Sequence, residues 1–187
     1  MHVHMRMEIE GKGTKKIYQK ALHSIQYISK MVSGETMSTN RFVPDDFEVP
    51  ASLETDRFRL RMLSVDDVEK DYEAVIESRE LLHRMFGGPW PRRGFTLEEN
   101  IADLKRHQQE FLSRRAFAYT VVSLDETRVL GCVYIDPPEN TDSDAVVVMW
   151  VRQTEYDKGL DEILFNTVRD WISSDWPFKK VDYPGRV

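Results

Sequence analysis

The chain has 187 residues, of which 41% are hydrophobic and 31% are charged. This balance is typical of a soluble globular protein with one sizeable core. No apolar run approaches the roughly 18 residues of a membrane span, and the start of the chain lacks the apolar centre of a signal peptide. A single cysteine, Cys132, excludes an internal disulfide and fits a reducing compartment. These features predict a cytoplasmic protein without membrane contact.

Charge divides the chain into unequal parts. Residues 1–36 carry a net charge of +3 and contain a helix candidate at 14–31, so we expect a basic, helical extension there. Residues 37–52 are rich in Ser, Thr, Asn and Pro and are expected to form a linker. The body, 53–187, is acidic and has no basic stripe, which argues against a nucleic-acid partner.

The first half of the body has the patterns of one strand and two helices. Residues 56–63 alternate apolar and basic side chains, which predicts a half-buried strand. Ser64 is placed to cap a first helix, and a second helix opens with a capping box from Thr96 to Glu99. We expect this second helix to bury five apolar residues: Leu97, Ile101, Leu104, Phe111 and Leu112.

The second half of the body predicts three longer strands, a helix and a short last strand. Residues 116–123 and 128–136 read as a hairpin, and 145–152 as the next strand. A long amphipathic helix starts at Leu160, and a short strand is expected at 180–183. The order β-α-α-β-β-β-α-β requires a mixed sheet, with the first two helices on one face and the helix from Leu160 on the other.

The segment from residue 146 to 172 joins a buried strand, a short polar loop with Gly159, and the helix from Leu160. Strand, glycine turn and helix N-terminus together aim backbone N–H groups at a phosphate. An ordinary connection between a strand and a helix has the same pattern, so geometry alone leaves both interpretations open.

Several motifs resemble the GNAT superfamily of acyl-CoA-dependent N-acyltransferases, in the branch that acetylates protein N-termini and small amines. They are LETDRFRLR from residue 53, GPWP from residue 88 with FTLEEN after it, and LGC from residue 130. The resemblance covers roughly residues 53–183. It implies a GNAT-like α/β fold, with a mixed, mostly antiparallel sheet flanked by helices. It also implies acetyl-CoA as cosubstrate and an amine as acceptor.

The resemblance assigns acetyl-CoA to two neighbouring groups of residues. The pantetheine arm is expected along the first group and the pyrophosphate on the second: Met149, Trp150 and Val151, then Lys158, Gly159 and Leu160. Two residues depart from the family's phosphate loop, because Tyr156 replaces an Arg or Gln and Asp161 replaces a small residue. Beside a pyrophosphate, the Asp161 carboxylate is a like charge that weakens binding.

The C-terminal part of the chain is shorter than the family pattern, which continues past this last strand with a helix and two strands. The chain ends at Val187, and an uncovered sheet edge invites pairing. A second copy in a homodimer, the N-terminal segment, or further residues could cover it.

Amine acylation needs a base for the ammonium and donors for the developing negative charge. Asp136 and Asp144, at either end of a turn-rich segment, are candidate bases. Tyr134 and Tyr183 are candidates to donate a proton to the leaving thiolate. The aspartates could equally be solvated turn residues, and the tyrosines core residues with satisfied hydroxyl groups.

Two functions therefore fit the sequence. The first is an acyl-CoA-dependent N-acyltransferase; the second is a GNAT-shaped binding or regulatory module that has lost transfer chemistry. Gly159 favours the first function, and Tyr156, Asp161 and the short C-terminus favour the second. We expect the first function, the N-acyltransferase. His83 and His107 are expected on the surface, and their spacing predicts no metal site.

Overall fold

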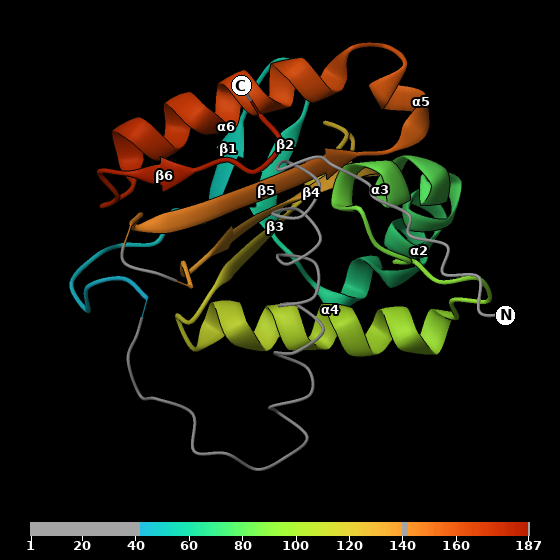
Figure 1. Ribbon diagram of the computed structural model, residues 1–187, viewed down its shortest axis with the longest axis horizontal. Coiled ribbons are helices and arrows are strands. Elements are labelled where there is room, and N and C mark those ends of the chain that lie inside the picture. The colour runs from blue at the N-terminus through green and yellow to red at the C-terminus, as the bar shows by residue number, and fades with distance from the viewer. Residues whose placement is uncertain (1–41, 140–141, 187) are drawn as a thin grey trace, which may run out of the picture.

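One six-stranded sheet forms the centre of the protein, and its strand order follows the chain order (Figure 1). The computed structural model describes residues 42–139 and 142–186, so the expected extension 1–36 with its helix at 14–31 lies outside the described residues. The strands are β1 (Ser52–Glu54), β2 (Arg59–Met62), β3 (Phe117–Val122), β4 (Val129–Asp136), β5 (Ala145–Val151) and β6 (Val181–Asp182). All neighbours are antiparallel except β5 and β6, which are parallel. The mixed, mostly antiparallel sheet expected from the sequence is confirmed.

Helices cover both faces of this sheet (Figure 1). They are η1 (Val65–Asp67), α2 (Val68–Glu77), α3 (Arg79–Phe86), α4 (Leu97–Leu112), α5 (Gln153–Tyr156) and α6 (Leu160–Asp175). Helices α2, α3 and α4 pack on one face, called the α4 face, and α6 packs on the other, called the α6 face. The expected placement of the helices is confirmed. The sequence patterns do not predict β1, α3 or α5, and α5 is a single turn inside the segment expected to be a loop.

The predicted helix starts are present in the structure. The Ser64 hydroxyl accepts a hydrogen bond from the Asp66 N–H at 3.2 Å, so Ser64 caps η1, which continues into α2. Thr96 and Glu99 form the complete capping box of α4. These contacts satisfy N–H groups that a helix N-terminus otherwise leaves without partners.

The expected burial of Leu112 is wrong, because its side chain is 67% exposed. The preceding residue, Phe111, turns its ring toward Phe117 in the sheet, with 5.1 Å between ring centroids. Successive helix residues point about 100° apart. Leu112 therefore lies past the edge of the buried stripe.

The core on the α6 face is continuous and almost wholly apolar. Its larger members come from β2 to β5, the residue before β2, and α6: Phe58, Leu60, Tyr119, Val133, Met149, Leu164, Trp171 and Ile172. Residues 42–50 pack against it: Phe42 stacks on Phe178 at 4.9 Å between ring centroids. The Arg114 guanidinium donates to the carbonyls of Pro44 and Phe47 at 2.6 and 2.8 Å. This part of the expected linker is therefore packed on the body.

Gly131 sets the contact between the two central strands, β4 and β5. A Cβ at this position would lie 2.0 Å from the Trp150 carbonyl oxygen and 2.8 Å from the Val151 Cα. Both atoms belong to the backbone and cannot rotate away. A glycine is therefore required here for β5 to pair closely with β4.

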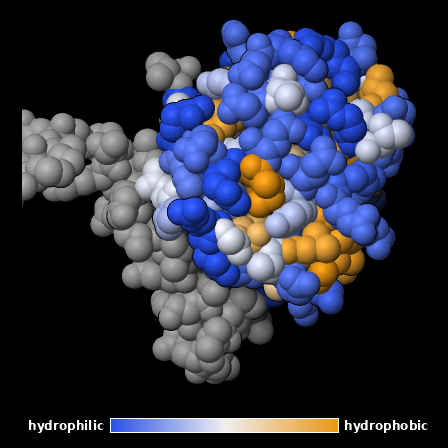
Figure 2. Space-filling model, turned by 90° about the vertical axis from the view of Figure 1, so that its right-hand side faces the viewer, coloured by the Kyte–Doolittle hydropathy of each residue, from blue (hydrophilic) through white to orange (hydrophobic). Residues whose placement is uncertain are grey.

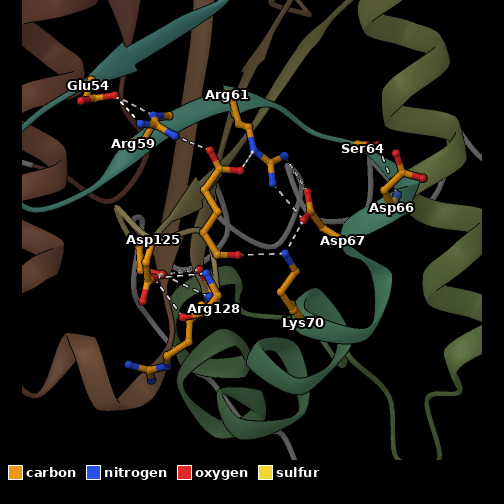
Figure 3. Close-up of polar contacts among 12 residues, drawn as sticks. Glu54, Arg59, Arg61, Ser64, Asp66, Asp67, Lys70, Asp125 and Arg128 are labelled. Atoms are coloured by element: carbon orange, nitrogen blue, oxygen red, sulfur yellow. Dashed lines mark hydrogen bonds and ion pairs between the residues drawn. The ribbon is translucent and has the colours of Figure 1, made fainter.

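A charged network fastens the start of α2 to the sheet, and Figure 3 shows Arg61, Asp67 and Lys70 pointing toward one another. Arg61 donates to both oxygens of Asp67 at 2.7 and 2.9 Å and to Glu126 at 2.9 Å. Lys70 lies 3.0 Å from Asp67. Burial works to raise the pKa of Asp67, but the hydrogen bonds from Arg61 and Lys70 outweigh it and lower that pKa. The network therefore holds a buried carboxylate in its charged form.

The face of the molecule that includes α3 and α5 is mostly hydrophilic, with small, separate hydrophobic patches (Figure 2). Within residues 42–139 and 142–186, no helix combines the length and the apolar character needed to cross a membrane.

Candidate acyl-CoA site

Strands β5 and β6 diverge, and this divergence leaves part of the β5 edge without a strand partner. They pair only at Ala145 with Val181 and at Val146 with Asp182, although β5 continues to Val151. The Arg152 N–H donates to Leu130 on the β4 side at 2.7 Å. Because bonded residues alternate in an antiparallel pair, Met149 and Val151 turn their backbone groups to the opposite edge. Among the described residues no strand pairs with that stretch.

The unpaired edge leads to the N-terminus of α6. Gly159 occupies the N-cap position with a φ of 79°, and no side chain caps the helix. A Cβ built on Gly159 would meet nothing within 4 Å, so the space beside it is open. An uncapped N-terminus presents free N–H groups and the positive end of the helix dipole. An anion can be bound there.

Asp161, the residue that the sequence analysis marks as unfavourable for a pyrophosphate, is paired with Arg186. Both guanidinium Nη atoms contact the carboxylate, and the Nη2–Oδ1 distance is 2.8 Å. The Arg186 guanidinium also lies over the Phe165 ring, 5.3 Å from its centroid. The negative charge of Asp161 is therefore balanced at the position where α6 begins.

The residues expected to bind acetyl-CoA fall into two arrangements. Met149 and Val151 are buried in the α6-face core, and Trp150 is buried on the α4 face. Leu160 is also buried in the α6-face core, whereas the Lys158 ammonium points to Glu155 at 3.0 Å. Met149 and Val151 are thus buried along the unpaired edge, whereas the space beside Gly159 is open.

Arg152 anchors the end of β5 where the loop to α6 begins. Its buried guanidinium donates to Glu77 through Nε at 2.9 Å and to Glu73 at 2.7 Å, both on α2. Burial opposes ionisation of Glu77, but hydrogen bonds from Arg152 and Thr154 lower its pKa to about 2. No sequence pattern marks Arg152, because an arginine at the end of a predicted strand reads as a surface residue.

The α4 face carries two of the four titratable groups that the sequence suggests for chemistry, Tyr134 and Asp136. Tyr134 and Asp136 alternate with core residues along β4, and His107 of α4 packs on the Tyr134 ring at 5.0 Å between centroids. Burial raises the pKa of Asp136 to about 6, while the charges of His107 and Arg106 act to lower it. Burial also raises the pKa of Tyr134 well above its usual range. A carboxyl that ionises near neutral pH thus stands beside a phenol that stays protonated.

Tyr183 and Asp144 lie apart from this pair. Tyr183 packs its ring against Phe165 of α6 at 5.5 Å between centroids. Asp144 accepts hydrogen bonds from the N–H groups of Lys179 and Lys180 at 2.8 and 2.9 Å, and these bonds lower its pKa. The structure therefore brings together Tyr134 and Asp136 but neither of the other two candidates.

His107 was expected on the surface, but its side chain is only 15% exposed. Asp71 is a buried group that no sequence pattern marks. His107 Nδ1 lies 3.3 Å from a Glu110 oxygen, and Arg106 approaches Nε2 at 3.0 Å. Asp71 is 4% exposed inside the α4 face. On an amphipathic helix both positions read as part of a polar side, and only the packing against β4 reveals them. The described residues contain no group of His, Cys, Asp and Glu side chains suited to a metal ion.

Comparison with known proteins supports the fold assignment. No family model and no curated protein matches the sequence. A structure described as a ribosomal-protein-serine acetyltransferase from Vibrio cholerae matches with a TM-score of 0.57 and 16% identity, over 75% of this chain and 74% of that one. The microcin C7 self-immunity acetyltransferase MccE, in complex with acetyl-CoA and AMP, matches with a TM-score of 0.53 and 14% identity, over 67% and 69% of the two chains.

The site and these matches define a class of fold. A mixed sheet whose β5 and β6 diverge beside the N-terminus of α6 is the arrangement of the GNAT acetyltransferases, and this chain has that fold. The resemblance stated from the sequence is confirmed at the level of the fold.

Proposed function

We propose that this protein is an acyl-CoA-dependent N-acyltransferase that transfers an acetyl group from acetyl-CoA to an amine. The observation that carries the proposal is the uncapped N-terminus of α6 at Gly159, which follows an edge of β5 that pairs with no described strand at Met149 and Val151. A pantetheine arm contains amides that can pair with such an edge, as an added strand would. The pyrophosphate would then reach the N–H groups after Gly159.

The α4 face supplies the acid–base chemistry in this proposal. Asp136 accepts a proton from the acceptor ammonium, and the free amine attacks the thioester carbonyl. The C–N bond forms, the nitrogen releases its second proton to solvent, the C–S bond breaks, and Tyr134 donates its proton to the leaving thiolate and is reprotonated from solvent. The backbone N–H of Met149 stabilises the oxyanion of the tetrahedral intermediate.

We also propose a cytoplasmic location and a homodimer. The buried thiol of Cys132 suits a reducing, cytoplasmic compartment. The outer side of β6 pairs with no strand among the described residues, so a second copy could add to the sheet there.

A thermal-shift titration with acetyl-CoA tests the binding step, because a ligand of the native state raises the melting temperature. Gly159→Val should abolish the shift, since the side chain would fill the space beside α6. Gly94→Val is the matched control, because Gly94 has nearly the same φ, 77° against 79°, and lies outside the β5–α6 loop. The control should keep the shift.

Turnover is measured as thiol release with peptides and small amines as acceptors.

One observation favours the alternative function, a binding module without transfer activity: Arg186 and Asp161 already pair at the start of α6. If millimolar acetyl-CoA leaves the wild-type melting temperature unchanged, the enzyme proposal fails and the binding-module function replaces it.

A further inference from the structure

Helix α5 is a single turn that leads from β5 to the start of α6, and it has no cap of its own. Arg152 occupies its N-cap position, and the Arg152 side chain makes no capping hydrogen bond. A helix this short makes too few internal hydrogen bonds to be stable by itself in water. The conformation of α5 therefore depends on contacts from elsewhere in the chain.

The junction of α2 and α3 supplies these contacts. Glu77 Oε1 accepts hydrogen bonds from the Thr154 N–H at 3.0 Å and from the Thr154 hydroxyl at 2.8 Å. The buried Ser78 hydroxyl accepts a hydrogen bond from the Gln153 N–H at 2.9 Å. These two N–H groups are the first of α5, and a helix cannot satisfy such groups internally. Glu77 and Ser78 therefore cap α5 from another part of the fold.

The second oxygen of Glu77 holds the residue that precedes α5. Glu77 Oε2 accepts a hydrogen bond from the Arg152 Nε at 2.9 Å. The Arg152 side chain is 3% exposed, and its guanidinium also donates to the Val129 carbonyl at 3.2 Å and to Glu73 at 2.7 Å. A buried guanidinium costs free energy unless its donors are satisfied. Glu77 therefore fixes both the N-cap residue of α5 and its first turn.

Backbone hydrogen bonds extend this anchor to Gly159. The N–H groups of residues 155–159 each donate to a carbonyl three or four residues earlier, at 2.9 to 3.1 Å. The segment from Arg152 to Gly159 is thus continuously bonded, and α6 begins at the next residue, Leu160. A change in the position of α5 would therefore change the backbone conformation at Gly159.

We propose that Glu77 and Ser78 are positioning residues for the phosphate groups of acetyl-CoA, because they fix α5 and, through it, the backbone at Gly159. The inference rests on the proposed acyl transfer. Neither side chain is assigned a contact with the ligand. They hold the start of α6 in its binding conformation before the ligand arrives, so binding does not have to order the loop. Such preorganisation raises affinity.

Amide hydrogen exchange tests the anchor without a ligand. In Glu77→Ala and in Ser78→Ala, the N–H groups of residues 155–159 should exchange about tenfold faster or more, because α5 opens more easily without its caps. Glu73→Ala is the matched control: it removes a carboxylate from the same guanidinium and leaves the caps of α5 in place. The control should exchange as wild type does. Unchanged exchange at 155–159 in both cap variants would overturn the inference.

Ligand binding then tests whether the anchor serves the phosphates. Glu77→Ala should raise the Kd of acetyl-CoA about tenfold, while the Kd of S-acetylpantetheine, which lacks the pyrophosphate, should change less than about twofold. Calorimetry measures both. In turnover, the KM for acetyl-CoA should rise with little change in kcat, which is the sign of lost binding. A merely structural role would affect both ligands equally or neither.

Ser78→Ala keeps the test valid if Glu77→Ala does not fold, because it removes a single hydroxyl from a buried site. It should weaken acetyl-CoA binding in the same selective way and by a smaller factor. Glu73→Ala should bind both ligands as wild type does. A loss in Glu73→Ala equal to the losses in the cap variants would overturn the inference.

The two proposals fail in different ways. If wild-type protein binds no acetyl-CoA, the acyltransferase proposal fails, and the role of Glu77 and Ser78 in phosphate binding fails with it. If wild-type protein binds acetyl-CoA and the cap variants bind it equally well, the acyltransferase proposal stands and the positioning role is wrong.

Discussion

The two faces of the sheet differ in what they bury. The α6 face encloses a continuous core of aliphatic and aromatic side chains. The α4 face has a smaller apolar cluster, and buried polar groups such as Asp71, Asn100 and Thr120 interrupt it. Apolar burial supplies most of the free energy of folding, whereas buried carboxyls cost free energy unless they are paired. The comparison indicates that one face stabilises the fold and the other holds the titratable groups.

The largest expected effect comes from breaking the α6-face core. Leu164 is fully buried, and Leu164→Ala should lower the free energy of unfolding by about 3 kcal/mol or more, because it removes apolar contact and leaves a cavity. Urea denaturation measures the change. Leu112→Ala, at an exposed site on α4, should stay within about 0.5 kcal/mol. A loss of less than about 1 kcal/mol at Leu164 would contradict the role given to this face.

On the α4 face, burying the ionised Asp71 carboxylate costs free energy, so the stability of the protein should depend on pH. The pKa of Asp71 is about 6 in the folded protein against an ordinary value of 3.8, so the folded state keeps a proton that the unfolded chain has lost. Stability should therefore fall as pH rises from about 4 to above 6. Asp71→Asn should gain about 2–3 kcal/mol relative to wild type across this range. Denaturant unfolding at pH 4 and pH 7.5 measures it, and parallel pH profiles for the two proteins would refute it.

The charged network around Asp67 in Figure 3 should contribute a pH dependence of stability opposite to that of Asp71. Arg61→Ala leaves the buried Asp67 with Lys70 as its remaining cation, and should cost about 2 kcal/mol at neutral pH. The pKa of Asp67 is lowered in the folded protein, so this contribution is present above about pH 4 and is lost as pH falls through the folded pKa. Arg57→Ala, at an exposed site before β2, is the control. An unchanged loss at pH 2 would show that packing dominates.

The smallest expected effects concern binding at the start of α6. Asp161→Asn removes a like charge and releases Arg186, and should tighten acetyl-CoA binding roughly tenfold, equivalent to about 1.4 kcal/mol. Arg186→Gln should weaken binding by a similar factor. Calorimetry with acetyl-CoA and with S-acetylpantetheine, which lacks the pyrophosphate, separates the charge effect from the rest. Equal changes for both ligands would show that the pair acts on the loop conformation.

Much of the fold could be predicted because local patterns and tertiary packing agree. Alternation before Leu63 predicts β2, the Thr96 capping box marks the start of α4, and the apolar stripe after Leu160 predicts α6. The break between α2 and α3 has a tertiary cause. Ser78 is fully buried, and its hydroxyl accepts a hydrogen bond from the Gln153 N–H at 2.9 Å. A contact across 75 residues leaves no local signal.

The sequence predicts the connection from β5 to α6 at Gly159, but not the contacts around it. The pairing of Asp161 with Arg186 depends on how the chain folds back after β6, and no spacing rule indicates it. The burial of Asp71 could not be predicted either, because a carboxylate on a helix is expected to face solvent unless the packing of that helix on the sheet is known.

The strand order has a consequence for how the molecule opens. Strands β1 to β5 pair as antiparallel neighbours, whereas β6 pairs in parallel with β5 only after the chain has crossed the sheet through α6. The β5–β6 pairing joins residues that are far apart in the sequence and consists of only two residue pairs. Such a strand is expected to open more easily than the rest of the sheet. Amide hydrogen exchange should therefore be fastest in β6 and slowest in β3 and β4. Opening β6 would widen access to the β5 edge while the rest of the sheet remains folded.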